Sequence, residues 1–262
     1  MDDLREQATQ AGRWPALSGP ASAFFGTLSS LLGRRVFHPQ GKLFRATVLL
    51  DEPSALRASL GGRGPLEAVI RFSRGAGFPE PIPDVLGISL KIHGLRRHDA
   101  VQDFLLVSSG PTPLFGRLLL PATGFLGRPF SSVLPFRIGS TVLLVGALPE
   151  RGLRRHDAGG FTEVETLARE GSLRYQLALG RTLGEWRPVG AIEVGRPIGG
   201  GEAADLRFDP WNCVDGVQPV GLLNGLRRAV YPTSQAARGE EAAGSGGVGH
   251  VVAEARSEHG AV

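Results

Sequence analysis

Hydrophobic residues alternate with polar ones, or form short β-branched runs, in several segments that are bounded by Gly, Pro or Asp. Such runs are typical of β-strands, because successive side chains of a strand point to opposite faces. Seven or eight short strands at close spacing favour an antiparallel barrel or sandwich. The strands that the pattern predicts are Phe44–Leu50, Glu67–Phe72, Gly87–Ile92, Asp103–Val107, Leu173–Leu179, Gly184–Val194 and Ala204–Phe208.

Helical spacing of apolar residues is limited to short segments. Ser22–Leu32 is expected to form a short amphipathic helix, and Gly221–Tyr231 a helix that Pro232 would end. Leu114–Leu148 is apolar but broken by Gly and Pro, and we expect short helices and loops there. The chain thus divides into an N-terminal arm and short helix (1–32), a barrel domain with its helix (33–239) and a flexible tail (240–262).

No segment is suited to crossing a membrane. The longest apolar stretch, Val133–Leu148, is too short and contains Pro135 and Arg137. The N-terminus, MDDLREQ, is acidic and polar and is not a signal peptide. Cys213 is the single cysteine, which excludes a disulfide framework and a thiolate metal site. We therefore expect a cytoplasmic protein with no integral membrane segment.

The charge balance does not indicate a nucleic-acid partner. The net charge is only +4, and all but two of the 29 basic residues are arginine, without a dense basic run. Arginine is still important locally, because its planar fork suits carboxylates. The heptad GLRRHDA occurs at 94–100 and again at 152–158. We interpret both copies as exposed turns and assign no chemistry to His98 or His156.

Tyr231 is one of only two tyrosines in the chain, and Arg227 precedes it by four residues. On a helix the two side chains would share one face, and a guanidinium beside a phenol lowers the pKa of that phenol. A tyrosinate is one of the known axial ligands of haem iron. The alternative from this spacing alone is a tyrosine in the core beside a solvated arginine.

The residues around Tyr231 resemble the proximal haem segment of the monofunctional haem catalases. That segment has an F-D-P-x-N turn, then a helix with R-x-x-x-Y-P, then an arginine seven residues after the tyrosine. All of these marks are present here: Phe208, Asp209, Pro210, Asn212, Arg227, Tyr231, Pro232 and Arg238. The resemblance implies haem b as cofactor, Tyr231 as iron ligand, Arg227 beside it, and Arg238 paired with a propionate.

Two further motifs of the chain resemble the distal haem side of the same family. The family's R-x-x-H motif with a following glycine matches Arg35, His38 and Gly41, and its V-R-F-S-like strand matches Arg71 and Ser73. By this resemblance Arg35 and Arg71 hold propionates, His38 is the base, and Ser73 bonds to its imidazole. A histidine base needs such a second group to fix its ring and tautomer.

The sequence also departs from the family. Where full catalases have an asparagine that bonds peroxide, the stretch DFLLVSSGPTPLF (103–115) has none, and Ser108 or Ser109 falls near that place. The chain is much shorter than a full catalase, and the resemblance covers about residues 33–239. It implies an α+β fold with an antiparallel barrel of about eight strands and a few short helices, one of them on the proximal side of the haem. We expect weak dismutation and better peroxidase activity on hydrogen peroxide or organic hydroperoxides.

Several alternatives remain open at this stage. One is rearrangement of fatty-acid hydroperoxides, as in allene oxide synthase-type proteins of the same superfamily. Others are a haem-binding module without efficient turnover, and an empty barrel, against which the arginines Arg35, Arg71 and Arg238 argue. Expected partners are a small-molecule peroxide and an organic electron donor, with no nucleic acid. The chain is expected to be a monomer or dimer.

Overall fold

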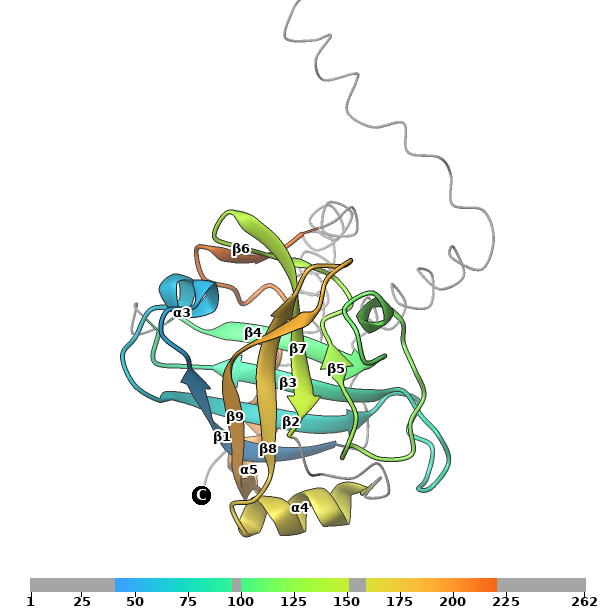
Figure 1. Cartoon of the computed structure of the whole chain (residues 1–262). Helices are drawn as coiled ribbons and strands as arrows, with labels where there is room; N and C mark the ends of the chain where they lie inside the picture. Colours follow the sequence, from blue (N-terminus) through green and yellow to red (C-terminus); the bar gives the residue numbers. More distant parts are fainter. Residues whose placement is uncertain (1–40, 96–99, 151–158, 221–262) are drawn as a thin grey trace, which may run out of the picture. The chain divides into compact units, whose positions relative to one another are not determined.

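The structure is a computed structural model that describes residues 41–95, 100–150 and 159–220. Eight antiparallel strands close into a barrel, in the order β1–β2–β3–β4–β5–β7–β8–β9 and back to β1 (Figure 1). The predicted α+β class with a barrel core is therefore confirmed. The barrel strands are β1 (Gly41–Leu50), β2 (Leu66–Arg74), β3 (Leu86–Ile92), β4 (Gln102–Ser108), β5 (Phe130–Ser131), β7 (Thr141–Pro149), β8 (Arg174–Gly180) and β9 (Trp186–Ile198).

Two short strands and four short helices complete the described part of the chain. β6 (Phe136–Ile138) pairs with β7, and β10 (Val217–Pro219) pairs with β6, so both extend the sheet beyond the barrel. The helices are α3 (Ala55–Leu60), η1 (Phe115–Arg117), α4 (Phe161–Arg169) and α5 (Gly201–Asp205). None of the helices in the described ranges is long and apolar enough to cross a membrane.

Two of the expected elements were wrong. Ala204–Phe208 forms no strand; α5 includes its start, in a Glu- and Ala-containing segment that favours a helix. Leu114–Leu148 is not only short helices and loops, because it contains β5, β6 and most of β7. The expected helices Ser22–Leu32 and Gly221–Tyr231 lie outside the described residues.

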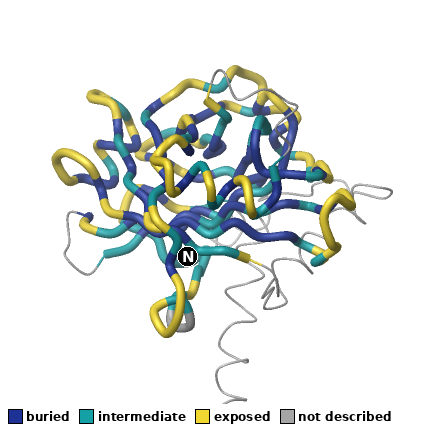
Figure 2. Tube along the Cα trace, turned by 90° about the horizontal axis from the view of Figure 1, so that it is seen from below, coloured by how far each residue is buried: buried dark blue, intermediate teal, exposed yellow. Residues whose placement is uncertain are grey.

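The barrel interior is filled by side chains. Phe72 lies at its centre, with ring centroids 5.6 Å from Phe44, 5.3 Å from Phe125 and 6.1 Å from Tyr175. The aromatic rings pack mostly edge to face, which is their preferred arrangement. Figure 2 shows the buried residues running along the strands and the exposed ones at the turns. A flat macrocycle therefore has no room inside the barrel, and a haem would have to lie against its outside.

The strands β1–β4 carry a second set of side chains on their outward side. On β2 the inward residues Ala68, Ile70 and Phe72 belong to the core, whereas Arg71 and Ser73 alternate with them and point outward. We call the outward side of these four strands the outer face. Ser73 is only 2% exposed although it lies on this face, so the face is covered at that point.

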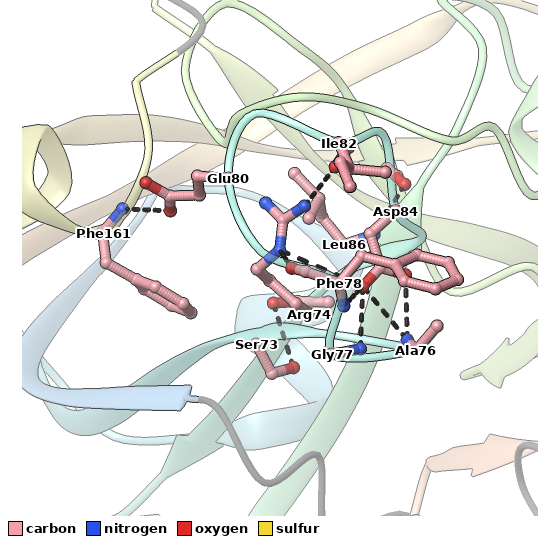
Figure 3. Close-up of polar contacts among 12 residues, drawn as sticks. Ser73, Arg74, Ala76, Gly77, Phe78, Glu80, Ile82, Asp84, Leu86 and Phe161 are labelled. Atoms are coloured by element: carbon pink, nitrogen blue, oxygen red, sulfur yellow. Dashed lines mark hydrogen bonds and ion pairs between the residues drawn. The ribbon is translucent and has the colours of Figure 1, made fainter.

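The loop between β2 and β3 is held by two buried charged residues (Figure 3). Asp84 accepts hydrogen bonds from the backbone N–H groups of Ala76, Gly77 and Phe78 at 2.9–3.2 Å. Arg74 is fully buried and donates to the carbonyl of Phe78 at 2.8 Å and to that of Ile82. These bonds satisfy most of the buried polar groups, which would be costly to bury alone; one guanidinium nitrogen of Arg74 has no hydrogen-bond partner among the described residues. They fix the end of β2, where Ser73 lies.

Candidate functional site

Of the predicted site residues the structure describes Arg71 and Ser73, and it also describes Ser108 and Ser109 near the place of the missing asparagine and the predicted turn 208–212. Arg35, His38, Arg227, Tyr231 and Arg238 lie outside the described residues, so their roles stay predictions. The geometry of the candidate site is therefore that of the barrel wall.

Arg71 and Ser73 lie two residues apart on the outer face of β2. Strand register places Ser73 between Gly41 of β1 and Gly87 of β3. Arg71 lies one step further along, between Leu43 and Ser89. The two polar side chains of the predicted distal strand thus share one surface, as the hypothesis requires.

The two glycines leave room that these side chains use. A Cβ built on Gly41 would lie 2.6 Å from a guanidinium nitrogen of Arg71, and one built on Gly87 would lie 2.8 Å from the hydroxyl oxygen of Ser73. Both distances are shorter than real Cβ contacts. Gly41 and Gly87 therefore form a shallow cradle in which the Arg71 and Ser73 side chains lie close to the backbone.

The environment of each side chain suits the predicted role. Ser73 donates a long hydrogen bond of 3.5 Å to the Gly87 carbonyl, which leaves the lone pairs of its hydroxyl free to accept an imidazole N–H. Burial lowers the pKa of Arg71, because removal from water disfavours the charged form. A carboxylate ligand beside Arg71 would favour its charged form.

The structure distinguishes the two serines at the end of β4. The Ser108 hydroxyl donates to the Leu120 carbonyl at 2.6 Å and accepts from the Leu86 N–H at 3.1 Å, so it is already used inside the fold. The Ser109 hydroxyl is buried and has no hydrogen-bond partner among the described residues. A buried hydroxyl without a partner is costly and calls for an explanation such as a ligand. Ser109 is therefore the better candidate for the position of the missing asparagine.

The second tyrosine of the chain is a core residue. Tyr175 on β8 is 1% exposed, and its hydroxyl donates to the Phe125 carbonyl at 3.2 Å. Burial raises the pKa of Tyr175 well above its usual range, so its phenol stays neutral. An anionic phenolate ligand, if this chain provides one, therefore has to come from Tyr231.

The F-D-P-W-N turn (208–212) lies on the same outer face as Arg71 and Ser73. It is held by Asp103 of β4, which accepts from the Asp209 N–H at 2.8 Å and forms an ion pair with Lys91 of β3. Lys91 is two residues after Ser89, the register partner of Arg71, which corresponds to about 7 Å along the strand. The turn that precedes the predicted proximal segment and the predicted distal strand thus share one surface. The sequence reasoning did not find Lys91 and Asp103, although two charges on adjacent, otherwise buried strands were a usable signal.

A groove of about 660 Å³ opens further along the barrel wall, lined by residues of β1, β2, β8 and β9. Its charged lining includes Arg45, Glu67 and Arg174, and Arg174 lies 3.8 Å from Glu193. Neither Arg71 nor Ser73 lines this groove, and its Arg174 forms ion pairs with Glu150 and Glu193. We do not assign the haem to it.

Comparison with known proteins gives a fold and no more. No protein-family model matches the chain, and no curated protein matches its sequence. Among solved structures it is similar to catalase A from Saccharomyces cerevisiae, with a TM-score of 0.55 and 11% identity over 80% of this chain and 62% of that one. It is also similar to a fungal catalase, with a TM-score of 0.56 and 10% identity over 80% of this chain and 61% of that one. The chain therefore has a distant catalase-like fold and spans less than two thirds of the length of these catalases.

Proposed function

We propose that this chain is a haem-dependent, catalase-like peroxidase that acts on hydrogen peroxide or organic hydroperoxides. One observation carries the proposal: on a catalase-like barrel, Arg71 and Ser73 lie on the same outer face as the turn that leads to the segment of Tyr231. The glycine cradle fits a ligand on this face, as does the Ser109 hydroxyl, which has no hydrogen-bond partner within 41–95, 100–150 and 159–220. Tyr175 is buried in the core and bonded to the Phe125 carbonyl, so Tyr231 is the tyrosine that would serve as the iron ligand.

The residues that would hold haem b come from both ends of the chain. Arg35, Arg71 and Arg238 would pair with the propionates, since a guanidinium binds a carboxylate through two parallel hydrogen bonds. Tyr231 would be the iron ligand, and Arg227 would favour its phenolate form. The bound haem would supply the redox chemistry of peroxide reduction.

His38 and Ser73 would handle the proton. The imidazole would take a proton from one oxygen of the peroxide and return it to the other, which makes the second oxygen a better leaving group. Ser73 would accept a hydrogen bond from the other ring nitrogen and so fix the tautomer. Its hydroxyl is buried and held against β3, so it is a rigid partner.

Ser109 in place of an asparagine favours peroxidase activity over dismutation. A serine hydroxyl donates one hydrogen bond from a shorter arm than an amide, so it would hold a peroxide less firmly. Dismutation needs a second peroxide in the same position, and an error of about 1 Å costs on the order of a hundredfold in rate. An organic electron donor would replace the second peroxide.

The test is expression with haem supplied, followed by product analysis. With hydrogen peroxide we expect oxidation of an organic donor to exceed oxygen release. With a lipid hydroperoxide we expect an alcohol together with oxidised donor. An epoxide or ketol product would indicate rearrangement, and oxygen release as fast as that of a full-length catalase would refute the weak dismutation. A protein that binds no haem at all would refute the proposal.

A further inference from the structure

A buried ion pair lies on the outer face, one step along the strands from Arg71. The ammonium of Lys91 is 2.8 and 2.7 Å from the two carboxylate oxygens of Asp103, its register partner on β4. Lys91 is 6% exposed and Asp103 is not exposed. The desolvation penalty of a buried pair can exceed the attraction within it, so stability alone is a weak reason for its presence.

The pair also binds the chain that follows α5. One carboxylate oxygen of Asp103 accepts from the Asp209 N–H at 2.8 Å and from the Asn212 side-chain amide at 3.1 Å. The Asp103 N–H in turn donates to the Asn212 carbonyl at 2.9 Å. The Phe208 ring lies over the Lys91 ammonium, 5.6 Å from it. Two adjacent strands thus hold both ends of the F-D-P-W-N turn.

The turn is rigid in itself and is followed by a second attachment. Asp209 closes it internally, because its carboxylate accepts from the Trp211 N–H at 2.9 Å and its carbonyl accepts from the Asn212 N–H at 2.9 Å. β10 then pairs with β6, and the Val220 N–H donates to the Pro135 carbonyl at 2.9 Å. The chain therefore leaves the barrel from a fixed point. Tyr231 follows Val220 by only eleven residues.

We infer that Asp103, held by Lys91, is a positioning residue for the haem: it anchors the turn that, together with β10, fixes the point at Val220 from which the Tyr231 segment departs. This inference rests on the proposed function. An iron ligand has to be placed accurately relative to the arginines on the barrel wall, and a fixed departure point restricts where the following segment can reach. Asp103 would not contact the haem and would act only through the turn.

The role of Lys91 is to keep the Asp103 carboxylate ionised, so that it can accept hydrogen bonds from the turn. Burial raises the pKa of Asp103, and the hydrogen bonds from Lys91 and from the Asp209 N–H oppose that rise. An ionised carboxylate accepts from Lys91, Asp209 and Asn212 together, whereas a protonated one would have a donor where an acceptor is needed. The anchor therefore depends on an oxygen acceptor at position 103.

Two double variants separate the acceptor from the charge. Lys91→Met with Asp103→Asn removes both charges and keeps an amide oxygen for the Asp209 N–H. Lys91→Met with Asp103→Leu removes the same charges and the acceptor, with a side chain of similar size. Replacing both members of a buried pair avoids the large penalty of leaving one charge alone. The matched control is Arg45→Met with Glu202→Leu, a half-exposed ion pair between β1 and α5.

The first readout is hydrogen exchange of the Asp209 amide in haem-free protein. We expect at least tenfold faster exchange in the Leu variant than in the Asn variant, and no change in the control. The amides of β2 should stay protected in all of them, which shows that the barrel is intact. Equal exchange at Asp209 in the two variants would overturn the inference.

The second readout is the ferric haem spectrum and the haem dissociation constant. We expect the Leu variant to bind haem at least tenfold more weakly and to lose the phenolate signature in part, and the Asn variant to restore both. Faster exchange at Asp209 with unchanged haem binding would mean that Asp103 anchors the turn without positioning the haem. That result would refute this inference and leave the proposed function standing. If the wild-type protein binds no haem, the proposed function fails and the positioning role fails with it.

Discussion

The two serines at the end of β4 give opposite predictions for the same substitution. Ser108→Ala removes the donor to the Leu120 carbonyl and the acceptor of the Leu86 N–H, which is then buried without a partner. Each bond contributes about 1 kcal/mol and an orphaned buried group costs about 1–3 kcal/mol. We therefore expect Ser108→Ala to lower the free energy of unfolding by roughly 2–3 kcal/mol.

Ser109→Ala should not lower the free energy of unfolding of the haem-free protein. Its hydroxyl is buried without a partner among the described residues, so removing it recovers part of that penalty and raises the free energy of unfolding by about 1 kcal/mol or leaves it unchanged. In the haem-loaded protein the same change should lower peroxide turnover about tenfold, the equivalent of one positioning hydrogen bond of about 1.4 kcal/mol.

Urea denaturation followed by circular dichroism measures the stabilities, and donor oxidation by peroxide measures the turnover. The contrast in sign is the important result, because both substitutions remove one hydroxyl from adjacent buried residues. A loss of 2 kcal/mol or more in Ser109→Ala, as large as in Ser108→Ala, would mean that Ser109 has a structural partner. It would then not be free for a ligand, and the reasoning about the missing asparagine would fail.

Three further predictions follow from the barrel wall. Gly87→Ala should push the Ser73 hydroxyl out of place, because the added Cβ would lie 2.8 Å from it, and should lower peroxidase activity roughly 10- to 100-fold. Gly199→Ala is the control, because open space surrounds Gly199, and it should change the activity little. Equal activities of the two variants would contradict the cradle. Asp84→Ala should lower the free energy of unfolding by about 3–5 kcal/mol in a denaturation experiment, because Arg74 is left buried without its carboxylate, and a cost under about 1 kcal/mol would refute this. Burial, with the nearby Lys91, lowers the pKa of His93 below its ordinary value of about 6.5, so the unfolded chain binds more protons than the folded one. The contribution of His93 to stability should therefore be full above about pH 6.5 and should be lost as the pH falls through the lowered pKa. His93→Gln should flatten the dependence of the unfolding free energy on pH between about pH 7.5 and 5.5.

Alternation predicted most of the barrel because most of its strands bury one face. Six of the seven expected strands are present, with ends shifted by a few residues. β7 was not found because its middle is buried on both sides: Leu144 is 1% exposed and Gly146 lies against the Trp186 ring, so this part of the strand is apolar on both faces. An apolar run interrupted by glycine does not show the period of a strand.

The polar site could be predicted only in part. Arg71 and Ser73 lie on one strand at adjacent outward positions, so the sequence alone places them together. Lys91 and Asp103 meet through strand register, and the hydrogen bond of Asp103 with Asp209 joins positions 106 residues apart. Neither local pattern nor composition specifies such contacts. The choice between Ser108 and Ser109 likewise depends on which hydroxyl the fold uses for itself.

The central claim is that Tyr231 binds haem iron as a phenolate, and the absorption and resonance Raman spectra of ferric, haem-reconstituted variants test it most directly. Tyr175→Phe is the matched control, because it removes the other tyrosine hydroxyl, at a cost of about 1 kcal/mol in stability for the lost bond to the Phe125 carbonyl. We predict that Tyr175→Phe keeps the phenolate signature of the wild-type protein and that Tyr231→Phe loses it. A phenolate signature that survives in Tyr231→Phe, or a wild-type protein without one, would contradict the account.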